Sequence, residues 1–190
     1  MSPAILGQFL KNPKHIGAIA SSSKGLSRTI VSEIGIESAS VILEYGPGTG
    51  VFTRQIVGAK RSDAIFAAIE QNPMLAAKFR QAFPDVVLYE DSAEKAPDIV
   101  RELGADHADC IVSGLPWAAF DNGLQDRLLA ATLEVLREGG KFVTFAYLQG
   151  LLMRSGKRFQ QKLKSNFSKV TRSRVVWWNL PPAFVYRCEK

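Results

Sequence analysis

The sequence predicts an α/β fold in which a mostly parallel sheet is built from βαβ units. Apolar runs of strand length alternate with stretches of helical periodicity over most of the chain. Near the end, two strand-like runs follow one another with only a short turn between them, so the last strand is expected to be antiparallel. With 190 residues, of which 46% are hydrophobic, the chain is expected to form a single core.

Five parallel strands are expected in the central part of the chain. They are residues 41–45, 64–70, 86–89, 109–113 and 141–147. Before the fifth strand, leucines from Leu124 to Leu136 recur at helical spacing, and Glu138-Gly139-Gly140 is expected to stop this helix. In the tail, residues 170–178 and 183–188 are expected to form two strands joined by residues 179–182. Alternation along residues 170–178 is expected to bury one of the tryptophans at 177 and 178.

Residues 1–36 precede the first strand and are expected to form amphipathic helices outside the sheet. The first helix is marked by an apolar stripe at Ile5, Leu6, Phe9 and Leu10. A second helix is expected after the three serines at residues 21–23, which supply an N-cap. The chain is therefore divided into an N-terminal helical part, 1–36, and a sheet-forming domain, 37–190.

Charge is distributed unevenly along the chain. The net charge is +6, yet residues 1–32 hold four basic and no acidic residues, and residues 33–140 hold nine basic and seventeen acidic ones. Residues 141–190 hold eleven basic residues and one acidic residue. Two basic ends around an acidic middle indicate that the ends meet an anionic surface, either lipid headgroups or nucleic acid. A solvated basic face without a partner is the alternative.

The cysteine and histidine content predicts neither a disulfide framework nor a metal site. Cys110 and Cys188 lie far apart and no Cys-x-x-Cys pair occurs, which fits a reducing, intracellular compartment. No signal peptide is recognised, and the apolar stretch at residues 142–153 is shorter than the roughly 20 residues of a membrane span. Any membrane contact is therefore expected to be peripheral.

The segment Glu44-Tyr45-Gly46-Pro47-Gly48-Thr49-Gly50 predicts a cofactor-binding turn between the first strand and the next helix. Glycines let the backbone turn sharply and approach a ligand where a Cβ would collide. The carboxylate of Glu44 would repel a pyrophosphate, but it suits the ammonium of a methionine moiety, directly or through water. The turn therefore predicts S-adenosylmethionine as the cofactor.

Two further acidic loops follow the second and third strands. Glu70, with Gln71 beside it, lies about twenty residues after the glycines, where a carboxylate accepts hydrogen bonds from both ribose hydroxyls. Dinucleotide sites share this placement, so NAD is a competing cofactor. Asp91 and Ser92 follow the third strand, where a carboxylate can accept from the adenine amino group. This third loop and the acid at Glu44 favour S-adenosylmethionine over NAD.

A fourth loop, Ser113-Gly114-Leu115-Pro116-Trp117, follows the fourth strand. It is expected to flank the transferable methyl group, with Ser113 and Leu115 at the cofactor; a simple strand-ending turn is the alternative. The carboxyl ends of parallel strands meet at one edge of an open α/β sheet, which is where such sheets bind ligands. The order and spacing of the four loops thus predict one cofactor site at this edge.

Together these features resemble the Rossmann-like class I methyltransferase fold, a seven-stranded, mostly parallel sheet with an antiparallel last strand. The segments at residues 17–23, 44–53, 113–117 and 181–187 are similar to those of the bacterial phospholipid N-methyltransferases. The resemblance implies successive methylation of phosphatidylethanolamine and its mono- and dimethyl products toward phosphatidylcholine. It also implies that the helices of residues 1–36 contact the membrane and cover the site.

On this basis the protein is expected to be cytoplasmic and peripherally associated with the inner face of the cell membrane. The N-terminal helix and the basic C-terminal region would both contact the anionic lipid surface. The nearest alternative is a ribosomal-RNA adenine N6-methyltransferase, in which the asparagine of an Asn-Leu-Pro-Tyr-like motif binds the flipped adenine. Ser113 stands at that position and replaces the amide poorly, so a nucleic-acid partner is not expected.

The catalytic candidates follow from the need for a neutral, aligned amine. Tyr147, at the end of the fifth strand, is the first candidate to orient the amine or take its proton. The rings of Tyr147 and Trp117 are candidates for cation–π contact with the methylated ammonium, and core packing is their alternative. Asp121 is a candidate to attract the ammonium, with a helix N-cap as its alternative. His15 is a candidate base, with an ordinary surface position as its alternative.

Overall fold

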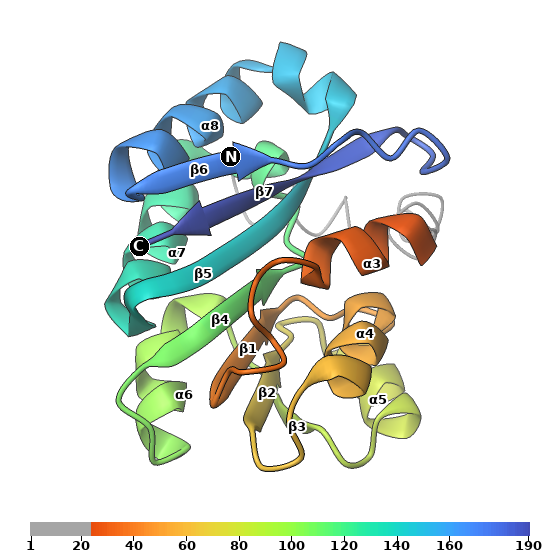
Figure 1. Cartoon of the computed structure of the whole chain (residues 1–190), viewed down its shortest axis with the longest axis vertical. Helices are drawn as coiled ribbons and strands as arrows, with labels where there is room; N and C mark the ends of the chain where they lie inside the picture. Colours follow the sequence, from red (N-terminus) through yellow and green to blue (C-terminus); the bar gives the residue numbers. More distant parts are fainter. Residues whose placement is uncertain (1–23) are drawn as a thin grey trace.

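The fold is a seven-stranded mixed sheet with helices on both faces (Figure 1). The computed structural model describes residues 24–190, and the strand order is β3-β2-β1-β4-β5-β7-β6. β1 to β5 run parallel, β7 pairs antiparallel with β5, and β6 pairs antiparallel with β7. The predicted class I methyltransferase fold is therefore confirmed. The predicted helix at residues 5–10, the serine cap predicted for the second helix at residues 21–23, and His15 lie outside the described residues.

Five of the seven strands lie close to the predicted runs, whereas β5 begins earlier and β6 ends earlier than predicted. The seven strands are β1 (Val41–Tyr45), β2 (Ile65–Ile69), β3 (Val87–Tyr89), β4 (Ala108–Ser113), β5 (Leu136–Tyr147), β6 (Lys169–Arg172) and β7 (Ala183–Glu189). The α-helices are α3 (Lys24–Val31), α4 (Val51–Ala59), α5 (Pro73–Ala82), α6 (Ala96–Glu102), α7 (Asn122–Val135) and α8 (Arg154–Asn166). Short 3-10 helices are η1 (Ala93–Lys95), η2 (Trp117–Ala119) and η3 (Leu148–Leu152).

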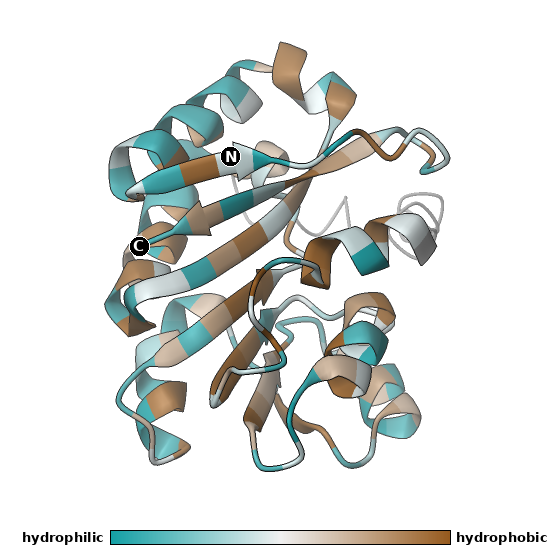
Figure 2. Ribbon diagram, in the orientation of Figure 1, coloured by the Kyte–Doolittle hydropathy of each residue, from teal (hydrophilic) through white to brown (hydrophobic). Residues whose placement is uncertain are grey.

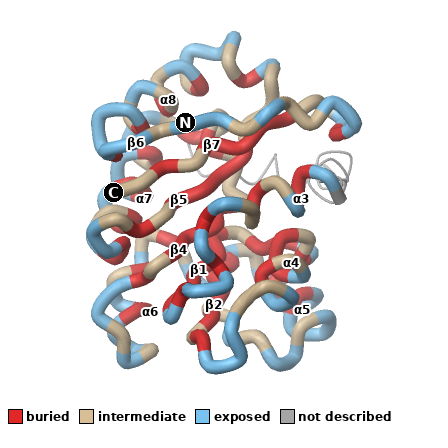
Figure 3. Tube along the Cα trace, in the orientation of Figure 1, coloured by how far each residue is buried: buried red, intermediate tan, exposed pale blue. Residues whose placement is uncertain are grey.

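The central strands are buried on both faces, which explains their continuous apolar sequences. β1 pairs with β2 on one side and with β4 on the other. Every residue of β1 is buried, and Figure 3 shows burial concentrated on the middle of the sheet. Parallel strands that are covered on both faces hold few polar side chains. The buried carboxyl of Glu44 in β1 is therefore an exception.

Two layers of helices cover the sheet (Figure 1). α3, α4 and α5 lie on one side, where Leu26 and Ile30 of α3 pack with the central strands in one apolar cluster. α6, α7 and α8 lie on the other side, where Leu128 and Phe159 belong to a second cluster. None of the helices between residues 24 and 190 is long and apolar enough to cross a membrane.

The transition from α7 to β5 differs from the prediction. α7 ends at Val135, and Leu136 already belongs to β5, where it pairs with Ala108. Glu138-Gly139-Gly140 lies in an irregular part of this strand, with Gly139 at a φ of 71°, and does not end the helix. Pairing with β4 sets the boundary, because it buries the Leu136 side chain completely.

The predicted strand over residues 170–178 is wrong in length. β6 ends at Arg172, and the hydroxyl of the next residue, Ser173, accepts a hydrogen bond from the Val185 N–H at 3.0 Å. A side-chain oxygen thus replaces the backbone carbonyl that would continue the ladder. Beyond it, an isolated bridge joins Val176 to Ala183.

The connection between β6 and β7 projects two tryptophans into solvent. Trp177 is 66% and Trp178 is 93% exposed, so the prediction that alternation buries one of them is wrong. Alternation fails because these residues lie beyond the regular strand. The last strand, β7, is antiparallel as predicted, and because β6 and β5 are both antiparallel to β7, β6 runs in the same direction as β5. The connection therefore returns to the edge where β5 ends and Tyr147 pairs with Ala183.

Candidate functional site

The glycine turn leaves β1 along a path that favours glycine. Gly46, Gly48 and Gly50 have φ angles of 63°, 55° and 79°, in the left-handed region that other residues rarely adopt. The N–H of Gly50 donates to the carbonyl oxygen of Pro47 at 2.8 Å, and Thr49 is exposed between them. Residues 46–50 therefore form one compact turn before α4.

The space around the turn is different at two of its glycines. A Cβ on Gly50 would lie 1.9 Å from the Phe83 ring, so this position is closed by packing. A Cβ on Gly48 would meet nothing within 4 Å. Because Gly48 faces open space, a ligand can approach the backbone of the turn on this side.

Glu44 is completely buried beneath the turn. The hydroxyl of Thr53 in α4 donates to its Oε2 at 2.7 Å, while Oε1 has no hydrogen-bond partner among the described residues. Burial raises the pKa of this carboxyl to about 8, because the charged form loses its water. A buried oxygen without a partner suits a ligand that brings its own donor. The residues present thus fit the ammonium end of S-adenosylmethionine.

Glu70 follows β2 and points back to the glycine turn. Its Oε2 accepts from the N–H of Gly48 at 3.2 Å, and its Oε1 accepts from the N–H of Asn72 at 2.9 Å. Burial raises the pKa of the Glu70 carboxyl, and these two N–H donors partly oppose that shift. Two loops that are separated in the sequence are thus joined by this carboxyl.

The loops after β2 and β3 present further predicted residues at the same edge. Gln71 is exposed beside Glu70. Asp91 is also exposed, and its Oδ1 accepts from the N–H of Ser92 at 2.6 Å. The Ser92 hydroxyl accepts from the N–H of Glu94 at 3.3 Å and caps η1. Asp91 therefore presents a carboxylate to solvent, whereas the Ser92 hydroxyl already serves the fold.

The loop after β4 packs directly on the glycine turn. A Cβ on Gly46 would lie 2.7 Å from the Leu115 side chain. Ser113 is buried, and its hydroxyl accepts from Nε1–H of Trp117 at 3.0 Å and from the N–H of Leu115 at 3.3 Å. Ser113 thus orders the fourth loop from beneath. Gly114 and Leu115 of this loop both contact the glycine turn, since the N–H of Gly114 donates to the carbonyl oxygen of Tyr45 at 2.7 Å and a Cβ on Gly46 would meet the Leu115 side chain.

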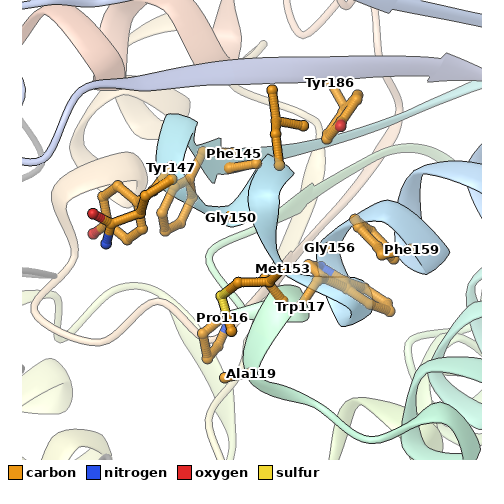
Figure 4. Close-up of a pocket in the computed structure, with 14 residues that line it drawn as sticks. Pro116, Trp117, Ala119, Phe145, Tyr147, Gly150, Met153, Gly156, Phe159 and Tyr186 are labelled. Carbon is orange, nitrogen blue, oxygen red and sulfur yellow. The ribbon is translucent and has the colours of Figure 1, made fainter.

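An apolar cavity of about 170 Å³ lies just beyond this loop (Figure 4). Its wall comes from η2, the end of β5, η3, the first two turns of α8 and Tyr186 of β7. Figure 4 shows the rings of Phe145 and Tyr147 beside each other, with Pro116 and Met153 on another part of the wall. Because Pro116 follows Leu115, the cavity adjoins the glycine turn through a single loop.

A close contact between two glycines shapes this cavity, and the sequence analysis missed it. A Cβ on Gly156 of α8 would lie 2.0 Å from the carbonyl oxygen of Gly150 in η3. The absence of that Cβ lets the start of α8 pack against η3. Thr53, Phe159 and Tyr186 were not predicted as site residues, because their roles depend on tertiary contacts that sequence spacing does not indicate.

The two aromatic candidates have different environments. Trp117 is buried, and its ring stacks on Phe159 with 4.6 Å between centroids. The structure therefore places Trp117 in the core, which is the alternative that the sequence left open. Trp117 also contributes to the cavity lining. Tyr147 is half-buried on the cavity wall with its ring edge-on to Phe145 at 5.4 Å. Burial raises the pKa of the Tyr147 phenol.

Asp121 is the N-cap of α7, as its alternative interpretation predicts. Its Oδ1 accepts from the N–H of Leu124 at 2.9 Å, and this hydrogen bond lowers the pKa of the carboxyl. His15 lies outside the described residues. Between residues 24 and 190, no group of three or more histidine, cysteine, aspartate or glutamate side chains is placed to hold a metal ion.

No family model matches the sequence. An ornithine lipid N-methyltransferase from Singulisphaera acidiphila is 33% identical over 188 residues, which cover 96% of this chain and 93% of that protein. The chain belongs to the family of this lipid N-methyltransferase. The protein is thus a methyltransferase, and the predicted family is confirmed.

Other similar proteins share the fold or a part of the sequence. Ribosomal RNA small subunit methyltransferase A of Chlorobaculum parvum is 38% identical over 74 residues, which are 39% of this chain and 26% of that protein. The crystal structure of an O-methyltransferase from Bacillus cereus in complex with SAH has a TM-score of 0.73 at 14% identity. The superposition covers 100% of this chain and 92% of the O-methyltransferase chain. The predicted cofactor, S-adenosylmethionine, agrees with this bound ligand.

Proposed function

We propose that this methyltransferase transfers methyl groups from S-adenosylmethionine to the amine of phosphatidylethanolamine and of its mono- and dimethyl products, toward phosphatidylcholine, at a membrane surface. The observation that carries the proposal is the apolar cavity beside the glycine turn, separated from it by Leu115 and Pro116. The family relationship to a lipid N-methyltransferase supports the same chemistry.

Each part of the cofactor has a proposed partner. Glu44 and the glycine turn would hold the methionine part, Glu70 the ribose and Asp91 the adenine amino group. The buried oxygen of Glu44 without a partner, and the open space at Gly48, support this arrangement. S-adenosylmethionine supplies a methyl group on a sulfonium, which is displaced in line by the acceptor nitrogen.

The cavity would prepare the amine for this displacement. A primary ammonium must lose its proton first, which costs roughly 3 to 4 kcal/mol at neutral pH for a pKa two to three units higher. Apolar walls disfavour the charged amine and recover part of this cost. Among the described residues that line the cavity there is no carboxylate and no histidine, so the proton would leave to water.

Tyr147 would orient the amine and would not act as a strong base. Burial raises the pKa of its phenol, so the hydroxyl stays protonated at neutral pH. A protonated phenol can still accept a hydrogen bond from the amine through its oxygen. Its ring can contact the methylated ammonium, an attraction worth about 0.5 to 2 kcal/mol. We assign no catalytic step to Asp121 or His15. Asp121 caps α7, and His15 lies outside the described residues.

The decisive experiment offers three acceptors to the protein with labelled S-adenosylmethionine. These are vesicles of phosphatidylethanolamine, vesicles containing ornithine lipid, and ribosomal RNA. The proposal expects mono-, di- and trimethylated phosphatidylethanolamine, with strongly reduced label after Glu70→Ala at a limiting cofactor concentration and normal label after Glu134→Gln, an exposed side chain on α7. Measured cofactor binding without any labelled lipid would refute it.

Ornithine lipid is a second proposed acceptor, because the family relative acts on it by name. Both lipids present a primary amine close to an anionic group, a phosphate in one and a carboxylate in the other. Label in ornithine lipid alone would keep the lipid N-methyltransferase and reject phosphatidylethanolamine. Label in RNA alone would instead favour the ribosomal-RNA alternative. The Ser113 hydroxyl argues against that alternative, because it already accepts a hydrogen bond from Trp117.

A further inference from the structure

The connection between β6 and β7 ends in a braced tip with apolar side chains outside. Val176 and Ala183 form the isolated bridge at its base, and the N–H of Asn179 donates to the carbonyl oxygen of Val176 at 3.2 Å. The buried Asn179 side chain donates to the carbonyl oxygen of Pro181 at 2.7 Å. One residue of the tip thus points inward and holds its shape, while Trp177 and Trp178 are left in solvent.

A second exposed apolar segment lies at the same edge of the sheet. The N–H of Leu148, the first residue of η3, donates to the carbonyl oxygen of Pro182 at 2.9 Å, which joins η3 to the base of the tip. At the other end of η3, Leu152 is 82% exposed and Met153 is also exposed. Met153 lines the cavity as well, so this apolar surface reaches its mouth. We call Leu152, Met153, Trp177, Trp178 and Leu180 the apolar rim.

Basic residues flank both segments of the apolar rim in the sequence. No acidic residue occurs between Glu138 and Glu189 in the sequence. Arg154 and Lys157 lie in the first turn of α8, directly after Met153, and Arg174 precedes the tip. Within residues 24–190, none of these three cations has an acidic partner within ion-pair distance, and Figure 2 shows α8 as largely hydrophilic.

We propose that the apolar rim inserts into the headgroup region of an anionic membrane, with the basic residues around it on the lipid phosphates. The proposal rests on the proposed function and adds to it the surface that docks on the lipid. Interfacial insertion favours tryptophan with other apolar side chains and flanking lysine or arginine, which is the composition found here. Docking by this edge would bring the cavity mouth at Met153 against the lipid amines.

The native tryptophans report directly on insertion. The chain has three tryptophans, and Trp117 is buried while the other two are in the rim. Vesicles that mix phosphatidylglycerol with phosphatidylethanolamine should shift the emission of the full-length protein to shorter wavelength. Lipids brominated near the headgroup should quench it. The variant with Trp177→Phe and Trp178→Phe keeps only Trp117 and should lose both effects.

A sedimentation assay then measures the contribution of the rim to binding. Replacing Trp177 and Trp178 together by alanine should weaken vesicle binding by about tenfold or more. The matched control replaces Val57 and Val87, two exposed apolar residues elsewhere, by alanine and should bind as the parent does. The unfolding temperature and cofactor affinity of both variants are measured to exclude a folding defect.

Three outcomes would overturn the proposal. They are unquenched tryptophans in protein that sediments with vesicles, unchanged binding by the alanine variant, and a fluorescence change with RNA but not with vesicles. Neither assay needs methyl transfer, so both can be interpreted even where no lipid becomes methylated. Failure of the proposed function is thereby kept separate from failure of the docking surface.

Discussion

Replacing Glu44 by glutamine should stabilise the cofactor-free protein while weakening cofactor binding. Burial raises the pKa of the folded-state carboxyl from its ordinary value of 4.5 to about 8. At pH 7 the unfolded chain has released a proton that the folded protein retains. The free energy of unfolding therefore falls by about 1.4 kcal/mol for each pH unit above 4.5, or about 3 kcal/mol at pH 7. Glutamine has a similar shape and cannot ionise, so the variant escapes this loss.

The assay is chemical denaturation of parent and variant from about pH 5 to about pH 8. The stability difference should be small at the acidic end and grow in favour of Glu44→Gln as the pH rises toward 8. Glu134→Gln serves as the control, because that side chain is exposed on α7. A difference between Glu44→Gln and the parent that stays constant with pH would refute the reasoning.

Binding of S-adenosylmethionine should change in the opposite sense. An ammonium beside Oε1 favours the ionised carboxyl, so the parent should release a proton on binding and bind more tightly as the pH rises toward 8. The variant should bind more than about tenfold more weakly and lose this pH dependence. Calorimetry in buffers of different ionisation enthalpy measures the proton release. Binding that is equally tight in the variant would remove Glu44 from the cofactor site.

Three other substitutions test separate parts of the site. Gly50→Ala should destabilise the fold by about 2 kcal/mol, because its Cβ would lie 1.9 Å from the Phe83 ring. Gly48→Ala should cost only about 1 kcal/mol of stability, for its left-handed backbone, but should weaken cofactor binding. Thermal unfolding measures the stability of both variants, and titration with S-adenosylmethionine measures their binding. Glu70→Ala should raise the dissociation constant of S-adenosylmethionine more than about tenfold, and an unchanged constant would contradict the ribose assignment. Tyr147→Phe should lower kcat by about tenfold or more with cofactor affinity unchanged, as single-turnover methylation would reveal; a normal kcat would leave the hydroxyl without a role.

The first half of the fold could be predicted because local pattern and tertiary structure agree there. β1 matches the predicted run from Val41 to Tyr45 residue for residue, since both faces of this strand are buried and its sequence is uniformly apolar apart from Glu44. The glycine turn and Glu70 could be assigned to one site for the same reason. Consecutive parallel strands bring their ends to one edge, whatever the details of packing.

The second half could be predicted less well because long-range pairing overrides local pattern there. Leu136 continues a helical spacing, yet its pairing with Ala108 places it in β5. Trp177 and Trp178 continue an apolar run, yet the side chain of Ser173 has already ended the ladder. The cavity depends on the approach of Gly156 to Gly150, and nothing in the spacing of those two glycines predicts it.

The residues proposed to bind the methyl donor and those that line the acceptor cavity come from different parts of the chain. The residues proposed for the methyl donor come mainly from the loops after β1, β2 and β3, whereas every described residue that lines the cavity falls between Pro116 and Tyr186. Donor recognition and acceptor recognition can therefore change independently during evolution. A chimera that keeps the first half and exchanges the second should inherit the acceptor of its new half, provided that the contact of Leu115 with the glycine turn is preserved.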